Sequence, residues 1–188
     1  MKSRMMGDYH VRFCERLGVR FPLSTRHKTV VRKLKKTAKM TFKGIDNQSV
    51  EFRITNYEFP KITDCEYDSN WLLIYLNVKS KCGNWKTTDP SLLTSDVKRI
   101  IEWLNDLSHN KTTETNLSFL EPNLEFELIK NQTDLKTVRI MFNLESRPQN
   151  ADDEKEYFVD CKMDNAELKK VAEELKKELE PFIERAIG

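Results

Sequence analysis

Two glutamates, Glu125 and Glu127, lie among apolar residues in the stretch LSFLEPNLEFELI. Paired carboxylates can act as the acid and base of a hydrolytic site when they face each other across a cleft from different elements. If Leu124, Phe126 and Leu128 point into a core, however, alternation places both glutamates on the opposite face of one strand, about 7 Å apart. On residue chemistry alone we interpret them as a solvated strand face, and the alternative is a surface that binds a basic partner.

No other set of residues predicts catalysis. The three histidines are scattered, the five glycines are isolated, and no GxSxG, HExxH or nucleotide-binding glycine loop occurs. Asp64, Glu66 and Asp68 could surround a cation, but the glycine and the closing glutamate of an EF-hand loop are absent. We therefore expect a solvated acidic loop there. We also expect that the protein is not an enzyme and that it has no catalytic residue, metal or cofactor.

The elements that position these residues follow from the periodicity. Period-two alternation predicts strands in MTFKGIDNQSVEFRITNYEFP and NWLLIYLNVKS, and again around residues 124–128, 138–144 and 157–161. The turn KCGNW follows the longest of them. In the stretch 138–144, we expect Val138, Ile140, Phe142 and Leu144 to share one buried face.

Two segments change to a helical period. An apolar stripe over residues 93–107 predicts a central helix with start signals up to Thr94, and a second stripe begins after the N-cap Asp164 with Glu167 three residues on. Pro181 is expected to kink this last helix. The order is three strands, a helix, four strands and a helix. It predicts an α+β fold, with an antiparallel, meander-like sheet and both helices packed on one face.

Charge divides the chain into two parts. Residues 1–36 hold eleven Lys and Arg against two acids, a net charge of +9, whereas the remaining 152 residues hold 21 Lys and Arg against 28 acids, a net charge of −7. We interpret residues 1–38 as a basic extension that is poorly ordered or not native, with Met40 as an alternative start, and residues 39–188 as one α+β domain. The alternative is that the basic arm binds nucleic acid.

Cysteine usage and hydropathy bear on the compartment. Cys14, Cys65, Cys82 and Cys161 are scattered and form no CxxC pair, so we expect free thiols rather than disulfides or a zinc site. No run approaches the roughly 18 apolar residues of a membrane helix, and the N-terminus lacks the apolar core of a signal peptide. We expect a cytoplasmic protein with no membrane contact.

A resemblance adds what the residues alone do not. Seven segments resemble, in order and spacing, the WapI family of immunity proteins, which protect Gram-positive bacteria from their own contact-dependent WapA/Rhs-type toxins. These segments are YEFP, DSNWL, TTDPSLLT, IEWL, LSFLEPNLEFEL, ESRP and YFVDCKM, within residues 40–188. Residues 1–36 depart from the family pattern.

The resemblance implies a stoichiometric binder of the C-terminal domain of a cognate toxin, often a nuclease, and it carries over no catalytic residue. Nucleic acid is then an unexpected partner, except through residues 1–36. An acidic inhibitor would be steered onto a basic, phosphate-binding toxin. From face and charge we expect the contact surface to include Glu51, Glu66, Tyr67, Asp68, Trp85, Glu125, Glu127 and Glu145. Trp85 or Tyr67 would be the aromatic anchor, and the alternative for Trp85 is a lid over the edge of the core.

Overall fold

The computed structural model describes residues 40–111 and 114–185. The basic extension predicted for residues 1–38, with its nucleic-acid-binding alternative, lies outside the described residues, and the domain boundary at residue 39 stays a prediction. None of the described helices is long and apolar enough to cross a membrane.

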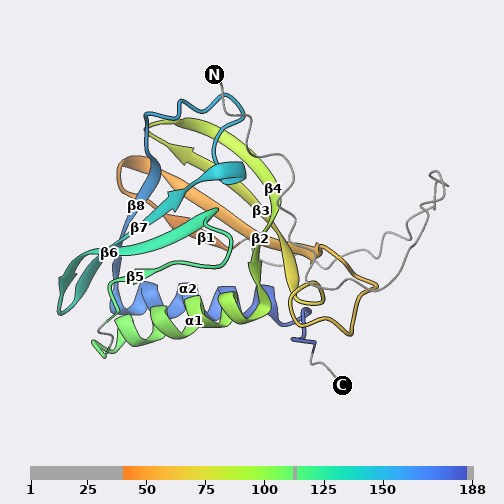
Figure 1. The fold of residues 1–188 in the computed structure, drawn as a ribbon. Helices are drawn as coiled ribbons and strands as arrows, with labels where there is room; N and C mark the ends of the chain where they lie inside the picture. Colours follow the sequence, from red (N-terminus) through yellow and green to blue (C-terminus); the bar gives the residue numbers. More distant parts are fainter. Residues whose placement is uncertain (1–39, 112–113, 186–188) are drawn as a thin grey trace. The chain divides into compact units, whose positions relative to one another are not determined.

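The described residues form two four-stranded antiparallel sheets and two α-helices (Figure 1). The first sheet runs β1 (Thr41–Lys43), β2 (Ser49–Tyr57), β3 (Trp71–Ser80) and β4 (Gly83–Leu93), in that spatial order. The second runs β5 (Asn116–Leu117), β6 (Leu124–Gln132), β7 (Leu135–Phe142) and β8 (Tyr157–Asp164). Helix α1 (Thr94–Ser108) connects the sheets, and α2 (Asn165–Leu179) follows the second. The 3-10 turns η1 (Ile45–Asn47) and η2 (Leu144–Ser146) lie between strands. The α+β class and the meander order are confirmed.

The sequence predicted one sheet, whereas the structure has two, one formed by the strands before α1 and one by the strands after it. The first sheet also contains a strand, β4, that the sequence did not predict. Strand β4 occupies a polar segment that contains Pro90, so its sequence does not show the apolar alternation of a strand. The proline is tolerated because β4 is an edge strand and its register shifts at Pro90, opposite Leu73. The turn before β4 is as expected, and Gly83 has a φ of 130°, a conformation that favours glycine.

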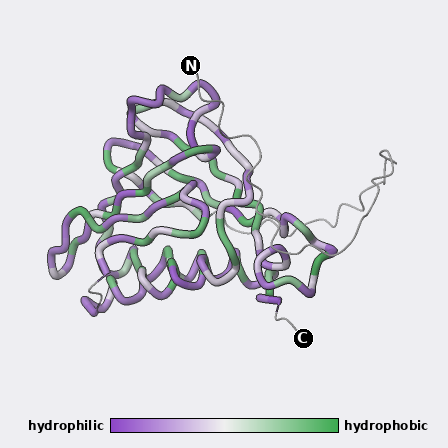
Figure 2. Tube along the Cα trace, in the orientation of Figure 1, coloured by the Kyte–Doolittle hydropathy of each residue, from purple (hydrophilic) through white to green (hydrophobic). Residues whose placement is uncertain are grey.

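The two sheets share one hydrophobic core. Phe42 of β1 packs against Phe126 of β6 with ring centroids 6.0 Å apart, and Trp103 of α1 packs edge-on against the same Phe126. Along much of β6 and β8, inward apolar residues alternate with more hydrophilic ones, and Figure 2 shows such alternation as changing colours along the tube. The two helices pack against each other, and their apolar stripes are buried (Figure 1).

Capping fixes where the helices begin and proline fixes where the second ends. In α2, Asp164 and Glu167 exchange side-chain to backbone hydrogen bonds of 2.8 and 3.1 Å, as the sequence predicted. In α1, the carboxylate of Asp96 accepts the N–H of Leu93 at 2.9 Å. Helix α2 ends at Leu179, so Pro181 ends the helix rather than kinking it.

Strand β7 contains a charged residue in its buried row. Lys136 lies on the same face as Val138, Ile140 and Phe142 and is 0% exposed. Its ammonium donates to Asn110 Oδ1 (2.7 Å), Thr133 O (2.6 Å) and Asn165 Oδ1 (2.6 Å). One lysine thus joins the end of α1, the β6–β7 hairpin and the start of α2.

The same strand ends earlier than predicted. Strand β7 stops at Phe142, and Leu144 lies in η2 with a φ of 45° and 44% of its surface exposed. The expectation that Leu144 shares the buried face of Val138 and Ile140 is therefore wrong. Alternation holds only while the backbone stays extended, and the left-handed residue turns this side chain outward.

Candidate partner-binding surfaces

The structure divides the eight predicted contact residues among three environments. Glu51 and Trp85 are buried, whereas Glu66, Tyr67 and Asp68 belong to the loop between β2 and β3. Glu125, Glu127 and Glu145 belong to the second sheet and the turn that follows β7. No single surface contains all eight.

The two buried residues have partners inside the protein. Glu51 accepts a hydrogen bond from Asn77 Nδ2 at 3.2 Å across the first sheet. Trp85 donates its indole N–H to the carbonyl of Ser146 at 2.8 Å and packs edge-on against Phe142 and Tyr157. Trp85 therefore covers the edge of the core, which is the packing role that we considered as the alternative to an anchor.

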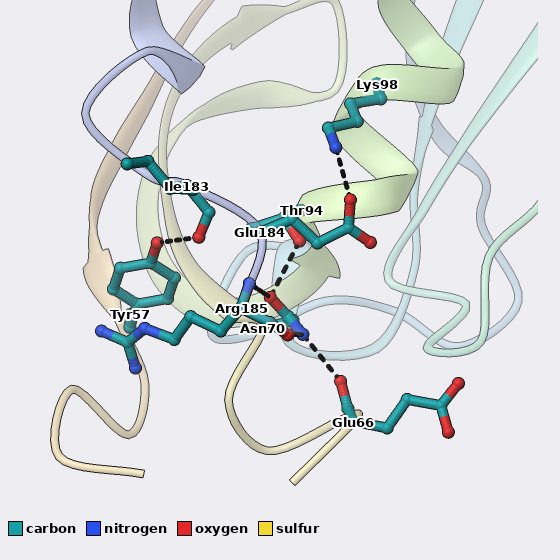
Figure 3. A network of polar contacts seen from close by, with 8 residues as sticks. All are labelled: Tyr57, Glu66, Asn70, Thr94, Lys98, Ile183, Glu184 and Arg185. Atoms are coloured by element: carbon teal, nitrogen blue, oxygen red, sulfur yellow. Dashed lines mark hydrogen bonds and ion pairs between the residues drawn. The ribbon is translucent and has the colours of Figure 1, made fainter. Parts of the chain in front are cut away.

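An open pocket of about 680 Å³ lies beside the β2–β3 loop. Three residues of that loop line it: Glu66, Tyr67 and Asn70. The other lining residues come from the end of β4 and the start of α1 (Leu93, Ser95 and Lys98) and from the segment after α2 (Ile183, Glu184 and Arg185). The network beneath it is drawn in Figure 3. Three segments far apart in the sequence therefore form its walls.

Asn70 holds these walls together (Figure 3). Its side-chain amide donates to the carbonyl of Arg185 at 3.0 Å and accepts the N–H of Arg185 at 2.8 Å, so it pairs with that backbone as a neighbouring strand would. The same amide donates to Glu66 O at 2.8 Å, and its oxygen also accepts the hydroxyl of Thr94 at 3.1 Å. Ile183 is held separately, because its carbonyl accepts the hydroxyl of Tyr57.

The two cations of this pocket are paired within the protein. Lys98 forms an ion pair with Glu184. The guanidinium of Arg185 stacks on the ring of Tyr57 at 3.6 Å and donates to the carbonyl of Ile62 at 2.7 Å. Burial raises the pKa of the Tyr57 hydroxyl, and Arg185 partly offsets that rise. These contacts fix the segment after α2 in place.

The outer face of the second sheet carries the glutamates of LSFLEPNLEFELI. Alternation along β6 directs Glu125 and Glu127 away from the buried Leu124 and Phe126, as predicted. Glu127 lies opposite Arg139 on β7, which in turn lies opposite Asp160 on β8.

Arg139 is the central cation of this face. It donates to both carboxylate oxygens of Asp160, at 2.7 and 3.0 Å, and lies 3.8 Å above the ring of Phe158. The hydrogen bond to Asp160 raises the pKa of the Arg139 guanidinium further. Because this cation is already paired with Asp160, the face as a whole stays acidic toward a partner.

Asn143 joins the turn that carries Glu145 to the loop before β6. Asn143 donates its backbone N–H to Asn123 O at 2.9 Å, and its side-chain amide donates to Pro122 O at 3.0 Å and to Glu125 Oε1 at 3.2 Å. The β5–β6 loop and η2, which holds the exposed Glu145, are therefore neighbours.

We name residues 118–127 and 143–156 the acidic end. The described residues hold 28 Asp and Glu against 20 Lys and Arg, a net charge of −8. The acidic end alone holds eight of those acids against Arg147 and Lys155, a net charge of −6. Both cations are paired inside it, with Asp153 at 3.0 Å and Asp152 at 2.8 Å respectively. The exposed side of α2, by contrast, carries Lys169, Lys170, Lys176 and Lys177.

Cysteines and metal ligands form no further site in the described part of the chain. Within residues 40–111 and 114–185, no group of three or more His, Cys, Asp or Glu is arranged to hold a metal ion. Cys82 and Cys161 are free thiols, and burial raises the pKa of Cys161 to about 12. Cys65 is disulfide-bonded, so the expectation of free thiols is wrong for this residue. Spacing along a sequence does not show which thiols a fold brings within bonding distance.

Sequence reasoning missed Asn70, Asn143 and Leu144. The two asparagines act through amide bonds to distant backbone, and an asparagine in a loop gives no signal of that role beyond its tolerance of turns. Leu144 fitted the strand pattern, so the signal pointed the wrong way.

Comparison with known proteins identifies the family. A family model described as the immunity protein WapI-like family matches residues 41–182, and the chain belongs to this family. The resemblance found in the sequence is thereby confirmed, and membership indicates a role in toxin immunity. No curated protein and no solved structure matches the chain.

Proposed function

We propose that this protein is the cytoplasmic immunity protein of a WapA/Rhs-type contact-dependent toxin. It binds the C-terminal domain of the toxin, a nuclease, in a one-to-one complex and blocks its active site without any catalysis of its own. The observation that carries the proposal is membership of the immunity protein WapI-like family over residues 41–182.

The charge distribution supports a basic partner. A nuclease holds phosphates and is basic around its active site. The acidic end concentrates a net charge of −6 in two neighbouring segments. Such a surface accelerates encounter with a basic domain and competes with the nucleic acid for the same cations.

Within this surface we propose Glu125, Glu127 and Glu145 as contact residues. All three carboxylates are at least partly exposed, and they lie on elements that Asn143 ties together. Glu66, Tyr67 and Asp68 form a separate surface at the β2–β3 loop. The buried Glu51 and Trp85 would support the fold beneath a partner rather than contact it.

The test is calorimetry of the full chain against the catalytically inactivated C-terminal domain of the WapA/Rhs-type toxin encoded beside it. We expect tight one-to-one binding, and inhibition of the active domain at the same ratio. Absence of binding by a folded chain would refute the proposal. It would then favour the basic arm of residues 1–36, which a parallel titration with RNA and DNA across salt concentrations would reveal.

A charge-reversed pair tests the surface. Glu125→Lys with Glu127→Lys should slow association about tenfold and weaken its dependence on salt, because steering acts mainly on the association rate. The matched control is Glu66→Lys with Asp68→Lys, which changes the net charge equally at the other surface. Equal effects of the two pairs would show that net charge, and not the acidic end, steers the partner.

A further inference from the structure

Leu144 is an apolar side chain that the fold turns outward into the acidic end. We propose that Leu144, with Leu120 on the neighbouring loop, is the apolar anchor that seats a basic protein surface on the acidic end. The inference rests on the proposed function for the existence of that partner. It goes further because it assigns the contact to two leucines that neither the charge nor the strand pattern of the sequence predicted as contact residues.

The exposure of Leu144 is imposed by the backbone. Its φ of 45° lies in the left-handed region, which is sterically disfavoured for a residue with a branched, non-polar side chain. Two residues earlier, Phe142 is buried in the row that Leu144 would continue. A leucine that gained nothing from exposure would be better placed in that row.

The surrounding contacts hold this conformation. Asn143 is fixed on one side by Asn123 and Pro122, and its carbonyl accepts the N–H of Ser146 at 2.9 Å. On the other side Arg147 N–H donates to Leu144 O at 3.2 Å, and the indole of Trp85 holds Ser146 O. The turn is therefore braced from the core, which presents the side chain in one place and reduces the entropy that a partner must remove on binding.

Leu144 is accompanied by a second exposed leucine. Leu120 is 58% exposed in the loop that Asn143 joins to η2. Within the described residues, large exposed hydrophobic side chains occur at four positions, and two of them, Leu120 and Leu144, belong to the acidic end. The others are Ile129 and Ile183. An apolar centre with a charged rim is the usual arrangement of a protein interface.

Charge complementarity defines the occupant. Glu121 and Glu145 directly follow the two leucines in the sequence, and the segments 118–127 and 143–146 contain no Lys or Arg. The partner is therefore a protein face with an apolar depression surrounded by Lys or Arg.

The test uses Leu144→Gly in the full chain, titrated with the same inactivated toxin domain. Glycine accepts a φ of 45° without strain, so the turn is kept while the side chain is lost. We expect the thermal midpoint to stay within about 2 °C of the unaltered chain, while Kd rises at least tenfold. Leu144→Asn, which also tolerates this conformation, should weaken binding equally.

The control is Ile129→Ser, which removes an exposed aliphatic side chain of β6 that lies outside the acidic end and outside the pocket. It should leave Kd within twofold. If the unaltered chain binds but Leu144→Gly binds within twofold of it, the anchor is refuted and the proposed function stands. If the unaltered chain does not bind, the proposed function fails, and the anchor fails with it.

Discussion

Replacement of Lys136 by methionine should destabilise the protein while leaving its surface unchanged. Lys136 is fully buried, and its ammonium has three hydrogen bonds of 2.6–2.7 Å, all to neutral oxygens. Methionine keeps most of the aliphatic stem and removes only the charged donor. The perturbation therefore isolates the polar contacts that join α1, the β6–β7 hairpin and α2.

The magnitude follows from two opposing terms. Hydrogen bonds to a charged donor are each worth roughly 1.5–3 kcal/mol, which gives a gross loss of about 4–9 kcal/mol. Against this, methionine avoids the cost of burying an ammonium, which is several kcal/mol. Asn110 and Thr133 are exposed residues whose oxygens can regain water in the variant. We expect a net loss of about 3 kcal/mol, or roughly 6–12 °C in the thermal midpoint for a domain of this size.

The assay is urea unfolding of the full chain followed by circular dichroism, with Lys162→Met as the matched control. Lys162 lies on the adjacent strand β8, opposite Thr137, and is exposed. The control should change the free energy of unfolding by no more than about 0.5 kcal/mol. If the two variants unfold at the same urea concentration, the three bonds of Lys136 contribute no net stability and the reasoning is refuted.

Two further predictions concern α2 and the segment after it. The carboxylate of Glu178 accepts the N–H of Ile54, and burial raises the pKa of this carboxyl above the usual 4.5. Between the unfolded and the folded pKa, the folded state therefore binds more protons than the unfolded state. The free energy of unfolding falls as the pH rises through this range. Glu178→Gln should therefore gain stability relative to the unaltered chain between pH 4 and pH 7 in urea titrations, and a constant difference would contradict this. Asn70→Ala should lower the free energy of unfolding by about 2–3 kcal/mol and accelerate amide exchange at Arg185, whereas Tyr57→Phe should lower it by about 1 kcal/mol. Equal losses would show that Asn70 does not hold the segment after α2.

Local patterns in the sequence predicted the elements around the candidate surface. The alternation of Leu124, Phe126 and Leu128 placed Glu125 and Glu127 on the outer face of a strand, and the structure agrees for both glutamates. The capping pair Asp164 and Glu167 marked the start of α2 to the residue. Both succeed because alternation and capping depend on residues within four positions of each other.

The predicted contact set was only partly brought together. Charge and face grouped Glu51 and Trp85 with the acids, but both are buried against residues from other strands or turns. Trp85 forms a hydrogen bond with Ser146, 61 positions away, and a local sequence pattern cannot predict a contact between residues so far apart. The pocket at the β2–β3 loop depends likewise on Asn70 meeting Arg185, 115 positions later.

The sequence by itself determined the α+β class, the meander order of the strands, the two helices and the family, because each rests on local periodicity or on the order of short segments. Only the tertiary structure decided that there are two sheets, that Lys136 points into the core and that Leu144 points out of it. The physical reason is the same in each case. A lysine can be buried only where acceptors 26 and 29 positions away converge on it, and a leucine can be held left-handed only where other segments brace its turn.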